Sequence, residues 1–373
     1  MPFIDMPDFA GELLDEFAKR KTVRIDTPVI QPAEPFLDMA GEDLRRRIFL
    51  TESETGASLC LRPEFTIPVC LRHIETATGT PKRYSYMGQV FRQRREGANE
   101  FYQAGIEDLG DADIAASDAR AIVDATAVLN RLLPSQTLSI TLGDQKVFEA
   151  VVAALGLPSG WQKRLVQAFG NIQQLEALLE GLINPKPVTG LDSRVAGLLA
   201  SGDETELVGY IDTVMQQTGY STNASRAPAE IARRLREKLA LAATRLSDHN
   251  FNTLKTFLSL QSPLSGASEA LAAFAQEAGL QLGAALSTFD GRVAALANSG
   301  ADLDNIQYKA AFGRPLDYYT GLVFEITKTG SVEVLAGGGR FDRLMTLLGA
   351  TDRIPAVGFS LWLDRIEMAR ASK

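Results

Sequence analysis

Histidine, cysteine and tryptophan are scarce in this chain, whose 373 residues contain two of each. His73 and His249 have no companion at the spacing of a metal site or a catalytic triad, so we expect structural or surface roles for both. Cys60 and Cys70 do not form a CxxC pair, which predicts neither a zinc site nor a disulfide framework. Both cysteines are expected to be reduced and buried. The sequence therefore argues against a catalytic triad and a histidine- or cysteine-based metal site, and we expect no metal and no cofactor.

Long apolar runs and basic blocks are also missing. No uninterrupted apolar segment approaches membrane-spanning length, and the N-terminus lacks the basic region and apolar core of a signal peptide. The formal net charge of -8 argues against a polyanion-binding surface as the main function of the chain. We therefore expect a soluble cytoplasmic protein of two or three domains that does not bind tRNA.

The most informative stretch is RYSYMGQVFRQRREGANEFYQAGIE, residues 83–107. It predicts a hairpin of two strands joined by a polar loop at 93–99. On the return strand Gln103, Gly105 and Glu107 fall at a spacing of two and share one face of the sheet. An amide and a carboxylate separated by a glycine would suit a small polar ligand, although a solvated antiparallel face has the same spacing.

Two other segments carry unusual polar residues. In SLCLRPEFTIPVCLRHI, residues 58–74, a strand is expected to turn at Pro63 into a helix, where Glu64 would ordinarily cap free N–H groups. The second segment is AFGRPLDYYTGLVFE, residues 311–325. Carboxylates, guanidinium groups, an amide and phenols placed on the predicted sheet could together hold an amino acid. The candidate residues are Glu64, Thr66, Arg92, Gln103, Glu107, Arg314, Tyr318 and Tyr319.

Two β-rich parts enclose a long helical part. Between 145 and 285 the apolar residues recur at helical spacing, with short breaks that contain Gly, Pro, Ser or Asn. Few parallel βαβ units are indicated, which favours an α+β fold with an antiparallel sheet backed by helices. Further helices are expected at 8–21, 111–133, 341–348 and 360–371, and further strands at 23–30, 137–142, 305–312, 318–327, 332–336 and 355–359.

Five blocks occur in order along the chain: LRPEFT, GQVFRQRREGANEFYQAGIE, RPLDYYTGLVFE, AGGGRFDRL and PAVGFSLWLDRI. Together they resemble the catalytic core of class II histidyl-tRNA synthetases over nearly all of residues 8–370. The resemblance implies a class II synthetase-like antiparallel sheet flanked by helices, with an all-helical insertion. Residues 1–145 and 286–373 would form the two parts of the core, residues 146–285 the insertion, and no anticodon-binding domain is expected.

The resemblance also implies a histidine pocket. Glu64, Thr66 and Gln103 would hold the α-amino group of the ligand. The α-carboxylate would face two guanidinium groups, and the imidazole would contact one carboxylate and one phenol. Arg92 and Arg314 would face the carboxylate. Glu107 and Tyr319, with Tyr318 beside them, would contact the imidazole.

Several positions depart from the synthetase pattern. The hairpin loop QRREGAN is short and has no counterpart of the arginine that the family places over the triphosphate. Trp362 stands where a family glycine leaves room for adenine, and a large ring there is expected to fill the nucleotide part of the cleft. Phe65 and Pro315 also replace glycines, and Phe341 replaces a tyrosine. Histidine recognition is therefore expected to be kept, and activation by ATP and tRNA binding to be lost.

A synthetase-like chain with these features is similar to the family of ATP phosphoribosyltransferase regulatory subunits. That similarity implies a non-catalytic partner of the short catalytic subunit in the first step of histidine biosynthesis. It also implies a hetero-octamer of four plus four chains, self-association as a dimer, and feedback inhibition by L-histidine. Two alternatives stay open: a truncated synthetase-like enzyme that forms histidyl-adenylate for another acceptor, and a scaffold that has lost ligand binding.

Overall fold

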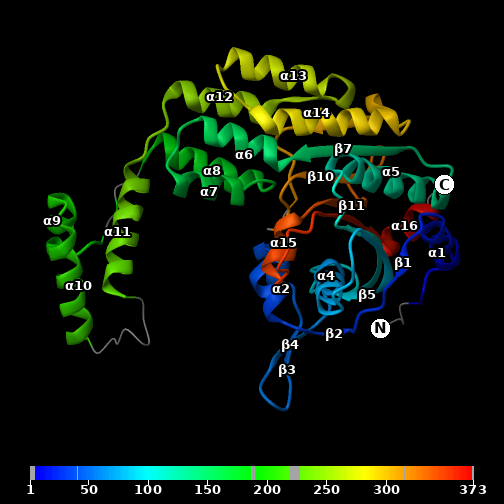
Figure 1. Ribbon diagram of the computed structural model, residues 1–373, viewed down its shortest axis with the longest axis horizontal. Coiled ribbons are helices and arrows are strands. Elements are labelled where there is room, and N and C mark those ends of the chain that lie inside the picture. The colour runs from blue at the N-terminus through cyan, green and yellow to red at the C-terminus, as the bar shows by residue number, and fades with distance from the viewer. Residues whose placement is uncertain are drawn as a thin grey trace.

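The computed structural model describes residues 5–39, 41–185, 188, 190–218, 227–314, 316 and 318–371. Pro315, one of the departures from the synthetase pattern, lies outside the described residues. Within these ranges no helix is both long and apolar enough to cross a membrane. Figure 1 shows a mixed sheet with helices on both of its faces, and the expected α+β class is confirmed.

Within the described residues, nine strands form the larger sheet, in the order β1-β5-β6-β12-β11-β10-β7-β9-β8. Neighbouring strands run antiparallel except for β1 beside β5 and β7 beside β9. A hairpin of β5 and β6 was expected from the sequence and lies next to β12. The bounds are β1 Val23–Arg24, β5 Lys82–Phe91, β6 Glu100–Leu109, β7 Leu138–Asp144, β8 Gln261–Pro263, β9 Ile306–Lys309, β10 Leu322–Lys328, β11 Val334–Arg340 and β12 Ala356–Trp362.

The alternation along β6 explains how the sheet separates a helix-packed face from a polar one. Ala104 and Ile106 belong to the large apolar core that the sheet forms with the helices α1, α5, α14 and α16. Gln103 and Glu107, which flank this pair along the strand, are also buried but face the opposite side. The four helices span α1 Ala10–Lys19, α5 Ile114–Leu132, α14 Gly283–Asn298 and α16 Leu363–Ala371.

The opposite face of the sheet is covered by a second apolar core and a small sheet. In Figure 1 the helices α2 and α4 lie on this side, away from α5 and α14. The small sheet has the order β2-β4-β3. These elements span β2 Ile30–Pro32, α2 Glu34–Met39, α3 Gly41–Arg45, β3 Leu50–Glu52, β4 Ser58–Leu61, α4 Thr66–Glu75 and α15 Asp342–Leu347.

The middle of the chain is helical apart from β8, whose three residues pair with β9 at the sheet edge. Three of its helices, α9 to α11, enclose a small core of their own and stand away from the sheet in Figure 1. The helices are α6 Gln145–Ala154, α7 Ser159–Gln167, α8 Ile172–Ile183, α9 Ser193–Ser201, α10 Glu204–Gln217, α11 Pro228–Ala243, α12 Asp248–Ser259 and α13 Leu264–Glu277, and a short 3-10 helix spans Leu303–Asn305.

A buried ionic cluster ties this helical part to the sheet. Arg292 of α14 pairs with Asp118 of α5 and with Asp144, which caps α6. Arg340 at the end of β11 donates from Nε to the other oxygen of Asp118, at 2.7 Å. All four side chains are at most 5% exposed. Displacing one of these elements would leave a buried charge without its partner, which would destabilise the fold. The ion pairs therefore hold the helices and the strand in position.

Four local predictions differ from the structure. The expected strand at 23–30 is two short strands in different sheets, because the chain passes between the sheets around Pro28, whose carbonyl accepts from Gln31 and Arg62. The polar segment 35–57, left without predicted elements, forms α2, α3 and β3. The strand expected from Tyr318 begins only at Leu322, and β12 continues to Trp362 where a helix was expected.

Candidate functional site

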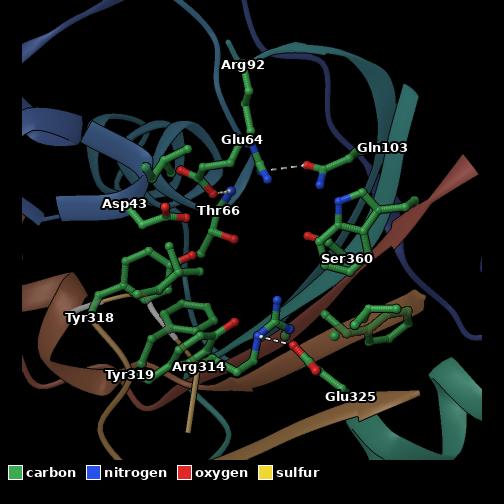
Figure 2. A pocket seen from close by; sticks show the side chains of 18 of the residues that line it. Asp43, Glu64, Thr66, Arg92, Gln103, Arg314, Tyr318, Tyr319, Glu325 and Ser360 are labelled. Atoms are coloured by element: carbon green, nitrogen blue, oxygen red, sulfur yellow. Dashed lines mark hydrogen bonds and ion pairs between the residues drawn. The ribbon is translucent and has the colours of Figure 1, made fainter. Parts of the chain in front are cut away.

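All eight candidate residues line one cavity of about 270 Å³ on the polar side of the large sheet. In Figure 2, Glu64, Arg92 and Gln103 lie on one side of an open space, and Arg314 and Glu325 lie on the other. The residues come from the start of α4, from the β5–β6 hairpin and from the segment before β10. A cavity of this size falls just below the range of about 300–1,000 Å³ typical of sites for drug-sized ligands, so it suits one small molecule.

Glu64 caps helix α4 and lines the cavity at the same time. Its carboxylate accepts from the backbone N–H groups of Thr66 at 2.6 Å and Ile67 at 2.9 Å, so the capping interpretation is confirmed. The side chain remains part of the cavity wall. Burial raises the pKa of Glu64, while the helix N–H groups and the Arg92 guanidinium act in the opposite direction.

Glu107 lies near the C-terminal end of β6, and one of its carboxylate oxygens is unsatisfied. The Thr66 hydroxyl donates to Oε1 at 2.7 Å, and Oε2 is buried without a hydrogen-bond partner among the described residues. Gly358 of β12 makes room for this carboxylate, because a Cβ there would overlap Oε2. Burial raises the pKa of Glu107 well above its usual range, and the neighbouring Glu64 carboxylate raises it further. A buried acceptor with no partner is a place for a ligand donor.

Arg92 and Gln103 form a polar edge of the cavity. The Arg92 Nε donates to the carbonyl of Pro63 at 2.7 Å, and Nη2 reaches Oε1 of Gln103 at 3.5 Å, as Figure 2 shows. Burial lowers the pKa of Arg92 to about 10, and Glu64 opposes this shift. The guanidinium therefore keeps its charge at neutral pH.

Arg314 enters the cavity from the segment that precedes β10. Its side chain is 8% exposed and forms an ion pair with Glu325 of β10 at 3.5 Å. Nε and Nη1 of Arg314 are buried and have no hydrogen-bond partner among the described residues. A guanidinium with unpaired donors is suited to an anionic ligand group, since leaving such donors unpaired is costly.

Tyr318 and Tyr319 pack beside each other, with ring centroids 5.0 Å apart, and both are buried. Burial raises the pKa of Tyr319 to about 12, while Arg314 lowers it. Burial also raises the pKa of Tyr318 well above its ordinary value. Both phenols are therefore neutral at physiological pH and keep an O–H group that donates or accepts.

The end of the cavity near α16 is filled with ionic and aromatic contacts. Arg94 lies over the Phe101 ring at 3.5 Å from its centroid and pairs with Asp364 at 3.1 Å. The Trp362 ring is 7% exposed and has the Arg365 guanidinium 5.0 Å from its centroid. That this end excludes a nucleotide stays a prediction.

Reasoning from the sequence missed several residues of the cavity wall. Asp43 belongs to α3, a helix that was not predicted, and Ser360 belongs to the part of β12 that was expected to be helical. Glu325 faces Arg314 from β10. The only sequence signal for Glu325 was its place in the same block as Arg314, because strand alternation alone does not tell which face is the ligand face.

The other scarce residues lie apart from this cavity. Cys60 and Cys70 are buried free thiols, as expected. His73 is buried in α4 with Nδ1 3.1 Å from the Tyr84 hydroxyl, and burial lowers its pKa. Within the part of the chain that the structure describes, no group of three or more His, Cys, Asp or Glu could hold a metal ion.

A second, more open cavity of about 810 Å³ adjoins the first. It lies where α7 and α8 face α2, α3 and α15, and its lining includes Asp43, Arg314, Tyr318 and Tyr319, which also line the first cavity. The shared wall means that a ligand in the first cavity would contact residues that also face the space between the core and the helical part.

Comparison with known proteins identifies the family. The family model described as histidyl-tRNA synthetase matches residues 6–208 and 204–366. A protein of Agrobacterium fabrum named ATP phosphoribosyltransferase regulatory subunit is 76% identical over 372 residues, covering 100% of this chain and 99% of that protein. A protein of the same name from Rhizobium rhizogenes is 73% identical, and the alignment covers 100% of both chains.

Solved structures agree on the fold. A structure described as an ATP phosphoribosyltransferase regulatory subunit/histidyl-tRNA synthetase from Bacillus halodurans superposes with a TM-score of 0.64 at 20% identity, covering 99% of this chain and 84% of that chain. Histidyl-tRNA synthetase from Nostoc gives a TM-score of 0.64 at 16% identity, covering 98% and 75%. The chain therefore belongs to the ATP phosphoribosyltransferase regulatory subunit family and has the histidyl-tRNA synthetase fold.

Proposed function

We propose that the 270 Å³ cavity binds L-histidine and that its occupancy controls a catalytic ATP phosphoribosyltransferase subunit. As a member of its family, the chain is a non-catalytic regulatory subunit that acts in histidine biosynthesis. The observation that carries the ligand proposal is the pair of unsatisfied buried groups in one small cavity, the Glu107 carboxylate and the Arg314 guanidinium. A ligand with a cationic or N–H donor end and an anionic end satisfies both.

The charges in the cavity suit a zwitterionic amino acid with a donor in its side chain. The α-carboxylate faces Arg314 and Arg92, and the α-amino group lies near Glu64, Thr66 and Gln103. The imidazole then places an N–H group against Glu107 and contacts the Tyr319 hydroxyl. Each charge-assisted hydrogen bond of this kind contributes about 1.5–3 kcal/mol, which favours histidine over amino acids that lack a side-chain donor.

The regulation we propose is allosteric linkage. The chain supports the activity of the short catalytic subunit, and histidine binds more tightly to the assembly of low activity. Because a ligand shifts an equilibrium only by its difference in affinity for the two states, a tenfold inhibition requires a difference of about 1.4 kcal/mol. The transfer chemistry belongs to the partner.

The assembly we propose is a hetero-octamer of four catalytic and four regulatory chains, in which the regulatory chains pair as dimers and no tRNA binds. Support for a dimer comes from apolar side chains left exposed near the edge strand β1 and on β2. Val23 is 46% exposed and Ile30 is 57% exposed. The apolar face of α1, by contrast, packs into the chain's own core through Leu13 and Phe17.

Isothermal titration calorimetry with L-histidine tests the ligand proposal directly. We expect saturable binding to one site per chain, together with a thermal shift. The absence of both heat and thermal shift would overturn the proposal in favour of a scaffold. Copurification with a short ATP phosphoribosyltransferase, followed by activity assays with and without histidine, then tests the regulation.

A separate assay distinguishes regulation from adenylate formation. Histidine-dependent exchange of pyrophosphate with ATP is expected to be absent, because the nucleotide end of the cleft is occupied. There the Arg94 guanidinium lies over the Phe101 ring, and Trp362 forms part of the cavity wall. Robust exchange in the purified chain would favour a synthetase-like enzyme.

A further inference from the structure

Arg314 is held in place by an unusual set of contacts. Its guanidinium carbon lies 5.6 Å from the centroid of the Trp362 ring and 5.8 Å from that of Tyr319. Glu325 is its single ion-pair partner among the described residues, at 3.5 Å. Nε and Nη1 have no hydrogen-bond partner. Aromatic rings and one carboxylate, which is ion-paired with Nε, therefore orient the guanidinium and leave Nη1 without a partner among the described residues.

The backbone beneath Arg314 leaves no alternative position on that side. Gly337 of β11 lies directly under the guanidinium, and a Cβ at this residue would overlap Nη1. Arg314 lies before the strand β10, where its carbonyl accepts from the N–H of Leu316 at 2.8 Å. The side-chain contacts above the sheet decide where the guanidinium N–H donors point.

Trp362 is the aromatic contact that belongs to a strand of the sheet. It is the last residue of β12 and lies opposite Gln103 of β6 in the strand register. Its ring is 7% exposed, and a second guanidinium, that of Arg365, lies 5.0 Å from the same ring. Tryptophan offers the strongest cation–π surface of the aromatic side chains. A ring fixed at a strand end between two arginines can hold one of them against the cavity.

We propose that Trp362 is a positioning residue that holds the Arg314 guanidinium toward a free carboxylate, so that the site selects an amino acid over analogues without that carboxylate. The inference rests on the proposed binding of histidine in this cavity. Its physical basis is that an analogue lacking the carboxylate leaves the buried donors of Arg314 unpaired, and sites built around a hydrogen-bonded group reject such analogues strongly. Trp362 enforces this selection through Arg314 without needing to touch the ligand.

Two ligands and two variants of the purified chain test the inference. Histidinol has the imidazole and the amino group of histidine but a hydroxymethyl group in place of the carboxylate. In the wild-type chain we expect calorimetry to show histidinol binding at least about a hundredfold more weakly than histidine. Trp362→Leu is expected to weaken histidine binding about tenfold and leave histidinol binding unchanged, whereas Trp362→Phe, which keeps a ring, stays within about threefold of wild type.

Trp161 supplies a matched control. It is 6% exposed, has the Arg164 guanidinium 5.3 Å from its ring, and lies in α7 outside the cavity. Trp161→Phe is expected to leave the ratio of histidine to histidinol affinity unchanged. If Trp362 acts through Arg314, Trp362→Leu should have no further effect on that ratio in a chain that already carries Arg314→Met. The effects of two substitutions that act through the same group do not add.

The outcomes separate the inference from the proposed function. If Trp362→Leu weakens both ligands equally, Trp362 is a wall of the cavity and the inference is overturned while histidine binding stands. If Trp362→Leu does not fold, Trp362→Met takes its place, because it also removes the ring: a loss shared equally by both ligands overturns the inference, and a loss confined to histidine supports it. If the wild-type chain binds neither ligand, the proposed function fails and the inference fails with it.

Discussion

The Thr66 hydroxyl donates a 2.7 Å hydrogen bond to Oε1 of Glu107, which joins the first residue of α4 to the C-terminal half of β6. The backbone N–H of the same threonine donates to Glu64 at 2.6 Å. Thr66 therefore lies between two buried carboxylates, those of Glu64 and Glu107, whose negative charges repel each other. This spacing leaves Oε2 of Glu107 free, and the proposed recognition of the imidazole depends on that oxygen.

Glu107→Gln is expected to weaken histidine binding by about tenfold to a hundredfold, since it replaces a charge-assisted hydrogen bond worth about 1.5–3 kcal/mol with a weaker contact. Calorimetry measures the affinity, and feedback inhibition of the assembled complex should weaken in parallel. Glu96→Gln, in the exposed loop between β5 and β6, is the control. Loss of assembly in Glu107→Gln would indicate a structural role for Glu107 instead.

The stability of the unliganded chain is expected to depend on pH through Glu107. Burial raises the pKa of this group above the ordinary value of 4.5, so the folded chain holds the proton more tightly than the unfolded chain does. Its contribution to stability is complete below pH 4.5 and is lost as the pH rises toward the folded pKa. Glu107→Gln avoids this loss, so its free energy of unfolding should rise relative to wild type, by at most about 1.4 kcal/mol per pH unit within that window.

Urea unfolding at about pH 5 and about pH 7 measures this difference, because the same pair of proteins is compared at both values. A difference between variant and wild type that is identical at both pH values would show that Glu107 titrates normally in the folded chain. Glu96→Gln, at an exposed position in the loop between β5 and β6, is the control in these measurements too.

Gly337→Ala is expected to reduce histidine affinity about tenfold or more, because the added Cβ would displace the Arg314 guanidinium from its position over β11. Calorimetry checks the affinity. Gly209→Ala in α10 is the matched control, since a Cβ there meets nothing within 4 Å and alanine favours the helix by about 0.5–1 kcal/mol. Unchanged binding in Gly337→Ala would mean that Arg314 does not reach the ligand from this side.

Arg292→Met is expected to lower the free energy of unfolding by about 3–5 kcal/mol, because Asp144 and Asp118 lose a buried cation. Urea unfolding monitored by circular dichroism measures the change. Arg233→Met removes an exposed ion pair with Glu237 and should cost no more than about 1 kcal/mol. Equal effects of the two substitutions would argue against a supporting role for the buried cluster.

Ile30→Asp is expected to shift the proposed dimer toward monomer, since it places a charge on an exposed apolar position of β2. Sedimentation velocity measures the shift. Val332→Asp is the control, because this side chain is 98% exposed in the turn between β10 and β11. A wild-type chain that sediments as a monomer would contradict the dimer itself.

Sequence patterns predicted the elements whose signals are local. The alternation in 83–107 predicted the hairpin β5–β6 and placed Gln103 and Glu107 on one face. Pro63 and Glu64 predicted the start of α4, because a carboxylate at that place satisfies free N–H groups whatever else surrounds it. The resemblance to synthetase blocks then linked Arg314, far along the chain, to the same pocket.

Other features depended on contacts between distant segments. The Tyr318 and Tyr319 rings suggested a strand, but they are buried in the segment before β10 and pack in the core beneath the small sheet. The polar segment 35–57 carries little periodicity, and α3 brings Asp43 to the cavity only because the rest of the second core holds that helix there. Propensity is a weak guide where tertiary packing supplies most of the stability.

The sequence by itself determined the fold class, the capped helix start and the identity of eight of the residues that line the cavity, because these depend on spacing and on ordered blocks. Tertiary structure alone decided which groups lack partners. Whether Oε2 of Glu107 and the donors of Arg314 are satisfied depends on neighbours from β12, β11 and β10, which no local pattern specifies. The physical reason is that the cost of a buried polar group is set by what surrounds it in space.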